Sequence, residues 1–248
     1  MGKIVAIGGG EIGRQGYPVE TTVIDRETVR LTGKKKPKLL FLPTASSDSD
    51  GYVKVVKKHF GKRLGCEVEA LYLIKPKISK REMERKILHS DIIYVGGGNT
   101  LKMLKVWKKL GVDRMLEKAW LKGIVLSGVS AGSICWFSDG VSDSRKFHDP
   151  KAGYIRISAL GFVPTLHCPH YDTEKGRKPQ LKRIMKSGGV AIALDNCCAV
   201  EIIDDKYRII KSKKGANAYK VFWKSGKFFE EKIPIRKEFL PLKSLLAK

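Results

Sequence analysis

Residues 123–137 read GIVLSGVSAGSICWF: an apolar run, a turn of small residues and a second apolar run. Ser130 lies in the turn, between Gly128 and Gly132. A serine flanked by small residues at a sharp strand-to-helix turn is a nucleophile elbow, which exposes its hydroxyl at the carboxyl end of a strand. Backbone N–H groups at the start of the following helix favour negative charge at that point. The stretch predicts a strand followed by a candidate nucleophile, Ser130, although so short a pattern also fits an ordinary strand–helix junction.

Apolar runs of strand length alternate with helical patterns over the first two-thirds of the chain. The runs at 38–42 and 92–95 are nearly all apolar, as is typical of parallel strands covered on both faces. This alternation predicts an α/β fold, a three-layer sandwich with a mostly parallel sheet. Strands are predicted at 3–8, 37–42, 67–73, 91–95 and 123–127, and helices at 50–63, 80–89, 99–109, 113–121 and 131–137.

The pattern changes from about residue 195 onward. Four short runs, at 199–203, 207–211, 218–223 and 227–233, are separated by turn-forming residues. They predict an antiparallel meander at the edge of the sheet, followed by a short amphipathic helix. Because the chain has no linker, repeat or low-complexity segment, we expect a single domain over residues 1–248.

The chain is strongly basic, with 49 Lys and Arg against 25 Asp and Glu and a formal net charge of +24. Such an excess raises the possibility of a nucleic-acid partner. The lysines, however, are spread along the whole chain, and only short clusters occur, at 34–36 and 213–214, both close to glycine. The pattern favours a solvated basic surface that attracts anionic ligands over a dedicated nucleic-acid face.

Other compositional features limit the location and the cofactors. No stretch approaches the ~18 uninterrupted apolar residues of a membrane span, and residues 3–7 suit a core strand better than a signal sequence. Five cysteines without metal-site spacing indicate reduced thiols and a cytoplasmic protein. We therefore expect no membrane contact, no metal ion and no cofactor; the sequence does not indicate the oligomeric state.

Two glycine-rich loops follow predicted strands. Residues 8–13 (GGGEIG) match the dinucleotide-binding pattern, but that site needs a helix starting at the loop, and the next residues, 14–18 (RQGYP), contain helix breakers. We expect a flexible loop there instead. Residues 96–98 are all glycine, so their backbone N–H groups can approach a ligand oxygen, unless the loop is merely a tight turn with Asn99 or Thr100 capping the next helix.

The second loop and the Ser130 turn are expected at the carboxyl ends of neighbouring strands, where open α/β sheets bind ligands. An oxyanion hole would then form from the N–H of Gly97 or Gly98 together with that of Ala131, the residue after the nucleophile.

A serine nucleophile needs a base, and the base needs a group that fixes its tautomer. His167 and His170 follow an apolar run, and in a strand they would point to opposite faces. We favour His170, with a buried structural histidine as the alternative. Asp143 is the expected acid and Asp149 the second choice, which gives the chain order Ser, Asp, His.

Taken together, three motifs resemble the peptidase E family, which is related to cyanophycinases and has a scaffold similar to class I glutamine amidotransferases (flavodoxin-like). They are residues 96–100 (GGGNT), 128–132 (GVSAG) and 168–172 (CPHYD), and the resemblance extends over essentially the whole chain. It implies Ser130 as nucleophile, His170 as base, an acid between them and a glycine-rich loop in the oxyanion hole.

Peptidase E cleaves dipeptides with an N-terminal aspartate and holds that side chain with an arginine beyond the catalytic histidine. The nearest counterpart is Arg177, although it follows His170 at a shorter interval than in peptidase E. On this resemblance we expect a serine peptidase acting on small peptides, with Asn99 and Arg177 binding the substrate. A catalytically inactive nucleic-acid- or anion-binding module on the same scaffold and a cyanophycinase-like isopeptidase are the alternatives.

Overall fold

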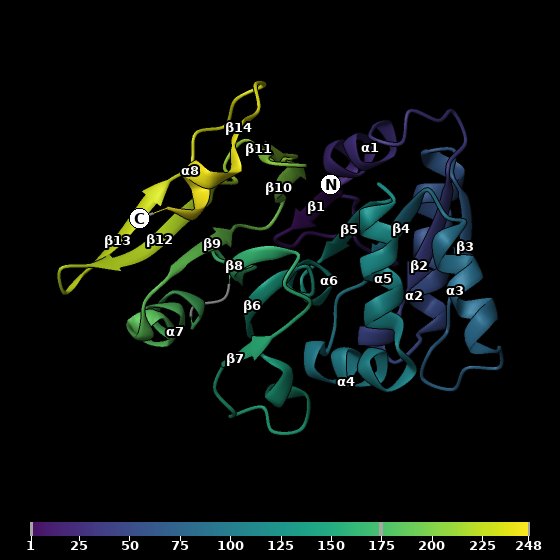
Figure 1. The fold of residues 1–248 in the computed structure, drawn as a ribbon, viewed down its shortest axis with the longest axis horizontal. Coiled ribbons are helices and arrows are strands. Elements are labelled where there is room, and N and C mark those ends of the chain that lie inside the picture. The colour runs from purple at the N-terminus through teal and green to yellow at the C-terminus, as the bar shows by residue number, and fades with distance from the viewer. Residues whose placement is uncertain (1, 174–175, 248) are drawn as a thin grey trace.

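The structure, a computed structural model, describes residues 2–173 and 176–247 and contains two β-sheets (Figure 1). In the eight-stranded sheet five adjacent strands are parallel to one another, and the other three, at one edge, pair in antiparallel fashion. Its strands are, in spatial order, β14 (Leu240–Pro241), β11 (Lys206–Lys211), β10 (Cys198–Ile203), β1 (Lys3–Ile7), β5 (Val125–Val129), β4 (Ile92–Val95), β2 (Lys38–Leu42) and β3 (Glu67–Ala70).

Successive side chains of a strand point to opposite faces of the sheet. Because both faces of this sheet carry apolar side chains, helices cover both faces. In β1, Val5 and Ile7 pack with α1 (Thr22–Arg30), with α2 (Asp50–Val56) and with the π-helix η2 (Lys57–Arg63) that continues α2. Ile4 and Ala6 face the opposite core instead. Three helices contribute to that core: α3 (Lys80–Leu88), α4 (Thr100–Leu110) and α5 (Val112–Leu121).

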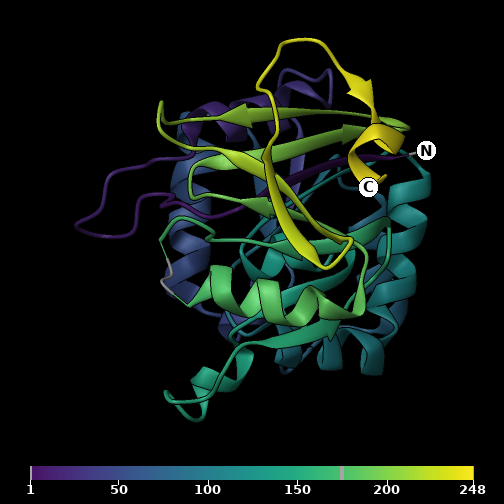
Figure 2. The same ribbon diagram turned by 90° about the vertical axis from the view of Figure 1, so that its left-hand side faces the viewer.

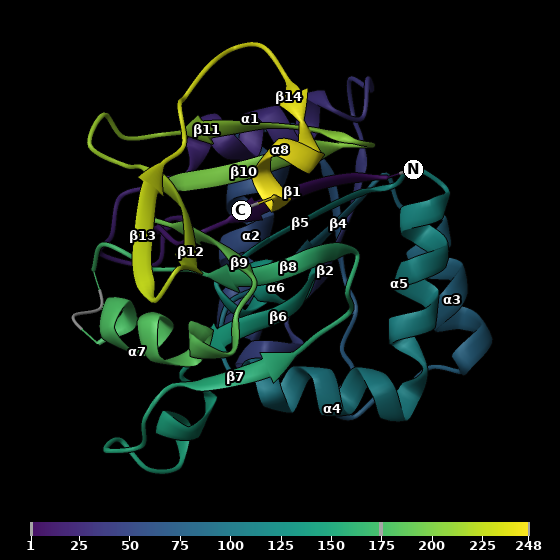
Figure 3. The same cartoon turned by 60° about the vertical axis from the view of Figure 1, so that its left-hand side comes forward.

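The second sheet has six strands and begins directly after the short helix α6 (Ala131–Ile134). Its outer face packs against α7 (Arg177–Ile184) and the 3₁₀ turn η4 (Met185–Ser187), and Figures 2 and 3 show α7 outside this sheet. Its spatial order is β13 (Lys227–Lys232), β12 (Ala218–Lys224), β9 (Val190–Leu194), β8 (Val163–Cys168), β6 (Phe137–Ser142) and β7 (Ile155–Ser158). The remaining short elements are η1 (Thr44–Ser46), η3 (Ser144–Phe147) and α8 (Leu242–Leu246).

The predicted fold class, a layered α/β structure with a mostly parallel sheet and antiparallel C-terminal strands, is confirmed. Four details differ from the sequence prediction. The second sheet was not expected, and the four C-terminal runs do not form one meander, because β10 and β11 belong to the first sheet and β12 and β13 to the second. In addition, α1 was not predicted, and the helix predicted at 131–137 is limited to α6 because β6 begins at Phe137. In the described part of the chain, no helix combines the length and the apolar character needed to cross a membrane.

Candidate active site

Ser130 occupies a strained turn between β5 and α6. Its backbone angles are φ 58° and ψ −114°, outside the regions that residues other than glycine prefer. The two flanking glycines make the turn possible. A Cβ at Gly128 would lie 2.3 Å from the carbonyl oxygen of Gly132, and one at Gly132 would lie 2.1 Å from that of Val95. Small residues therefore let α6 start directly against β4 and β5, which leaves the hydroxyl at the carboxyl end of the sheet.

His170 reaches this hydroxyl from the second sheet. It follows β8, and its backbone N–H donates to the carbonyl of Gly8 at the end of β1 (2.9 Å). Its Nε2 lies 2.8 Å from Oγ of Ser130. Two segments that are distant in the sequence are thus joined by a hydrogen bond of the kind that activates a serine nucleophile.

Asn196 orients the imidazole. Its Oδ1 lies 2.7 Å from Nδ1 of His170, and its backbone N–H donates to Oδ1 of Asp172 (2.9 Å). Because an amide oxygen only accepts hydrogen bonds, Nδ1 carries the hydrogen and Nε2 is left as the acceptor for the Ser130 hydroxyl. The resulting Ser–His–Asn chain has the tautomer that general-base catalysis requires.

The structure differs here from the sequence expectation of an acid at Asp143 or Asp149. Asp143 precedes η3, where its carbonyl accepts the N–H of Lys146, and Oδ1 of Asp149 accepts the N–H of Lys151 in an exposed turn. The reason lies in the sheet order: β8 has two parallel neighbours, β6 and β9, and the third group comes from the end of β9 rather than β6. The polar pair at 195–196, directly after the apolar run of β9, was the available signal for Asn196.

The first glycine-rich loop supports the imidazole. A Cβ at Gly9 would lie 1.9 Å from Oδ1 of Asn196 and 2.5 Å from Nδ1 of His170, and the Gly9 carbonyl accepts the N–H of Cys197 (2.9 Å). No helix begins at this loop, since α1 starts only at Thr22. The loop instead lies directly against the His170–Asn196 hydrogen bond.

The second glycine-rich loop lies next to the nucleophile. A Cβ at Gly97 would lie 3.4 Å from the Cβ of Ser130, and the Gly97 N–H donates to the hydroxyl of Tyr52 (3.3 Å). Ala131 is the first residue of α6, so its N–H has no partner within that helix.

Gly98, the other expected donor, has φ +137° and packs against the carbonyl of Ala45, 2.3 Å from where a Cβ would be. It does not line the cavity beside Ser130.

A cavity of about 770 Å³ opens above Ser130 and His170. Its charged lining residues are Glu11, Arg14 and Lys54. The Glu11 carboxylate fixes this part of the wall, because it accepts the backbone N–H groups of residues 12–14 and the Nε–H of Arg14 (2.6 Å). The remaining lining residues are Gly10, Ile12, Gln15, Ser49, Gly51, Tyr52, Val55, Gly97 and Val129.

The two residues expected to bind substrate lie outside this cavity. Arg177 is 1% exposed, its Nη1 donates to the carbonyl of Val141 (2.6 Å), and its guanidinium lies 4.7 Å from the ring centre of Tyr154. Asn99 caps α4 by accepting the N–H of Lys102 (2.9 Å), and its amide donates to the carbonyl of Ser144 (3.2 Å). Both side chains are thus engaged in structural hydrogen bonds.

His167, the alternative base, is a buried structural histidine. Its Nε2 lies 2.8 Å from Oγ of Ser133 and its Nδ1 donates to the carbonyl of Ile192 (3.0 Å). Burial lowers the pKa of His167 to about 3, so the ring is neutral over the physiological range. It joins the helix after the nucleophile to the second sheet.

Comparison with known proteins places this geometry in context. The sequence model of peptidase family S51 matches residues 4–210. The uncharacterized peptidase YgaJ of Bacillus subtilis is 35% identical over 95% of this chain and 99% of its own. A probable alpha-aspartyl dipeptidase of Drosophila melanogaster is 30% identical over 56% of this chain and 55% of its own, and peptidase E of Streptomyces coelicolor is 26% identical over 62% and 63%.

Two solved structures share the fold. A peptidase from an acI-B1 actinobacterium superposes with a TM-score of 0.73 at 18% identity and covers 97% of both chains. A putative peptidase E from Listeria monocytogenes superposes with a TM-score of 0.65 at 21% identity, covering 85% of this chain and 98% of its own. At these identities the likeness concerns the fold alone.

Proposed function

The chain belongs to peptidase family S51, and from this premise we propose that it is a serine-type peptidase of small peptides with Ser130 as nucleophile. The observation that carries the proposal is the continuous hydrogen-bond chain from Ser130 through His170 to Asn196, with steps of 2.8 and 2.7 Å. Such a chain activates a hydroxyl that would otherwise be a weak nucleophile.

In the proposed mechanism, Oγ of Ser130 attacks the scissile carbonyl while Nε2 of His170 takes its proton. His170 then protonates the leaving amine, and a water activated by the same imidazole hydrolyses the acyl-enzyme. Asn196 keeps the imidazole in the required tautomer without adding a negative charge. The N–H groups of Ala131 and Gly97 stabilise the oxyanion, for which Gly97 exchanges its hydrogen bond to the Tyr52 hydroxyl. The loss of one such donor typically costs ~3 kcal/mol of transition-state stabilisation.

We propose dipeptides with an N-terminal aspartate as substrates. The cavity volume of about 770 Å³ suits a small ligand. Lys54 and Arg14, which is paired with Glu11, line it and carry positive charge that can attract an acidic side chain. Two relatives carry the names alpha-aspartyl dipeptidase and peptidase E. In this proposal Arg14 takes the place that the sequence suggested for Arg177, because Arg177 does not line the cavity.

The decisive experiment compares wild type with Ser130→Ala on a panel of dipeptides that vary in the N-terminal residue, with Asp-Leu as reference. We expect Ser130→Ala to lose several powers of ten in kcat. Ser138→Ala is the matched control, since Ser138 lies in β6 outside the cavity and should keep wild-type activity. In parallel, a fluorophosphonate probe should label wild type and Ser138→Ala but not Ser130→Ala. Undiminished turnover in Ser130→Ala would refute the assignment.

The same panel separates the remaining alternatives. An isopeptidase of the cyanophycinase type would cleave a β-aspartyl bond in preference to Asp-Leu. A basic binding module would show neither turnover nor labelling, and its affinity for nucleic acid would fall steeply with salt, as the net charge of +24 would then require.

A further inference from the structure

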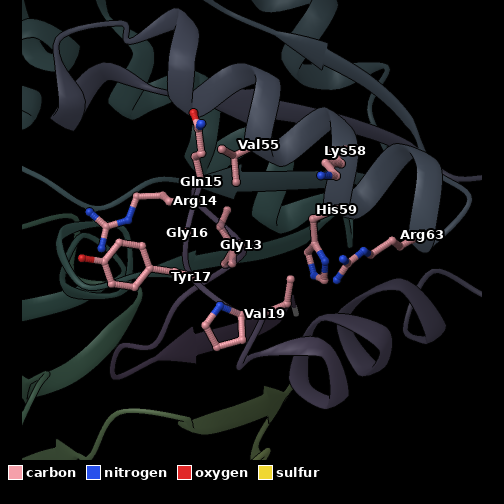
Figure 4. A pocket seen from close by; sticks show the side chains of 12 residues that line it. Gly13, Arg14, Gln15, Gly16, Tyr17, Val19, Val55, Lys58, His59 and Arg63 are labelled. Atoms are coloured by element: carbon pink, nitrogen blue, oxygen red, sulfur yellow. The ribbon is translucent and has the colours of Figure 1, made fainter.

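A second cavity adjoins the catalytic cavity and shares lining residues with it. Figure 4 shows the side chains that line this second cavity. Its volume is about 270 Å³, and neither Ser130 nor His170 lines it. The loop of residues 12–19 closes one side, and the end of α2 with η2 closes the other. The residues that the two cavities share are Ile12, Arg14, Gln15 and Val55.

A buried histidine forms part of the lining of this second cavity. His59 is 1% exposed, and its Nε2–H donates to Oδ2 of Asp25 (2.8 Å), which also accepts the hydroxyl of Thr21 (2.6 Å). Within the part of the chain that the structure describes, Nδ1 of His59 has no hydrogen-bond partner. Buried polar atoms are rarely left without a hydrogen-bond partner, and a group bound in the cavity would supply one for Nδ1.

Two cationic side chains line this cavity together with His59. Lys58 and Arg63 are exposed and line the same cavity, and Figure 4 shows Arg63 reaching toward His59. They share a face because η2 is a π-helix, in which residues five apart follow one another along the axis; the Leu64 N–H, for example, donates to the carbonyl of His59. Among residues 2–173 and 176–247, neither cation has an ion-pair partner, whereas Arg14 across the cavity is paired with Glu11.

We propose that this cavity binds a phosphate group, held by Lys58, Arg63 and Nδ1 of His59. Two unpaired cations supply the charge that attracts a dianion. Because hydrogen phosphate carries both acceptor oxygens and an O–H donor, it satisfies Nδ1 whether that atom donates or accepts. Asp25 fixes the ring so that Nδ1 is the free position. The cavity is small enough to exclude a nucleotide and large enough for inorganic phosphate or a small phosphomonoester.

The test measures binding and does not depend on peptidase activity, so it also stands if the proposed function fails. Inorganic phosphate and glycerol phosphate are titrated into wild type by calorimetry, with chloride keeping the ionic strength constant. The double variant Lys58→Ala/Arg63→Ala removes both cations from the cavity. Lys57→Ala/Lys62→Ala is the matched control, because it removes the same charge from the same helix at exposed positions outside the lining.

We expect saturable binding that weakens by about ten-fold or more in Lys58→Ala/Arg63→Ala and by less than about two-fold in the control. The ¹⁵N signal of Nδ1 of His59 in wild type should shift on saturation, a readout that needs no substitution of a buried residue. Tighter binding of inorganic phosphate or of glycerol phosphate identifies the source of the group. Equal losses in the two double variants, or no saturable binding of either anion, would overturn the proposal.

Discussion

Gly9 and Asn196 are so close that a single added carbon would separate the imidazole from the group that orients it. The Cβ that any other residue would place at Gly9 falls 1.9 Å from Oδ1 of Asn196, well inside van der Waals contact. The loop after β1 therefore requires glycine at position 9, because any side chain there would collide with the hydrogen bond between His170 and Asn196.

Gly9→Ala should impair catalysis much more than folding. The methyl group displaces Asn196 or His170, and misplacement of a catalytic group by about 1 Å can cost about 100-fold in rate. We expect kcat/KM on Asp-Leu to fall by at least that factor while the circular dichroism spectrum stays that of wild type. Gly215→Ala is the control, since an added Cβ there meets nothing within 4 Å. Full activity in Gly9→Ala would show that the loop moves freely away from the imidazole.

Asn196 should act through the oxygen that it offers to His170, and not through charge. Asn196→Ala removes the acceptor for Nδ1–H, and we expect kcat to fall by about 100-fold or more. Asn196→Asp keeps an oxygen in place and adds a charge that stabilises the imidazolium formed during catalysis, so its kcat should at least match that of wild type. Single-turnover measurements on both variants separate this effect from substrate binding. A loss in Asn196→Asp equal to that in Asn196→Ala would contradict the role.

Arg14 and Arg177 should have opposite effects when substituted. Arg14→Gln removes a cation from the cavity wall, and we expect KM for Asp-Leu to rise by about ten-fold, equivalent to about 1.4 kcal/mol, with no change for Ala-Leu. Arg177→Gln removes the donor to the Val141 carbonyl in a buried site, so it should lower the free energy of unfolding by about 1–3 kcal/mol and leave the KM ratio of the two dipeptides unchanged. A selective KM increase in Arg177→Gln would restore the expectation from the family resemblance.

The parallel core of the fold is predictable because its strands are short apolar runs that can be recognised from the local sequence. The strand predicted at 91–95 is observed as β4 (Ile92–Val95), and all four of its residues are buried. By contrast, the buried face of α1 is mostly polar: Asp25 and Thr28 are buried beside a single buried apolar residue, Ile24, so a search for apolar runs passes over this helix. The sequence FSDGVS of β6 is similarly uninformative, because its strand pairing comes from long-range contacts.

The residues of the site also differ in whether the local sequence predicts them. The turn at Ser130 leaves a strong local signature because it needs glycines at fixed positions. The role of Asn196 depends on β9 lying next to β8, and that of Arg177 on its burial against Val141. Neither fact follows from spacing along the chain, and Asn196 comes after His170, so a search for acids between Ser130 and His170 did not consider the residue that lies against Nδ1 of His170.

His167 should make the protein sensitive to mild acid. Its pKa in the folded protein is about 3 because the ring is buried, against about 6.5 in the unfolded chain. Between these values the unfolded state binds more protons than the folded state, so the free energy of unfolding decreases as the pH falls from about 6.5 toward 3. One such group contributes a slope of at most about 1.4 kcal/mol per pH unit. Urea unfolding at several pH values measures this slope.

Substitution separates the contribution of His167 from that of the acidic residues. His167→Gln is expected to be less stable at neutral pH, because Ser133 and the Ile192 carbonyl lose good partners. Its stability should nevertheless depend less on pH below 6.5 than that of wild type, by about 1 kcal/mol per unit. His148→Gln, in an exposed position, should keep the wild-type slope. If His167→Gln and wild type lose stability in parallel over this range, the acid sensitivity arises from other groups. The pKa of the buried His167 ring would then not differ between the folded and unfolded states.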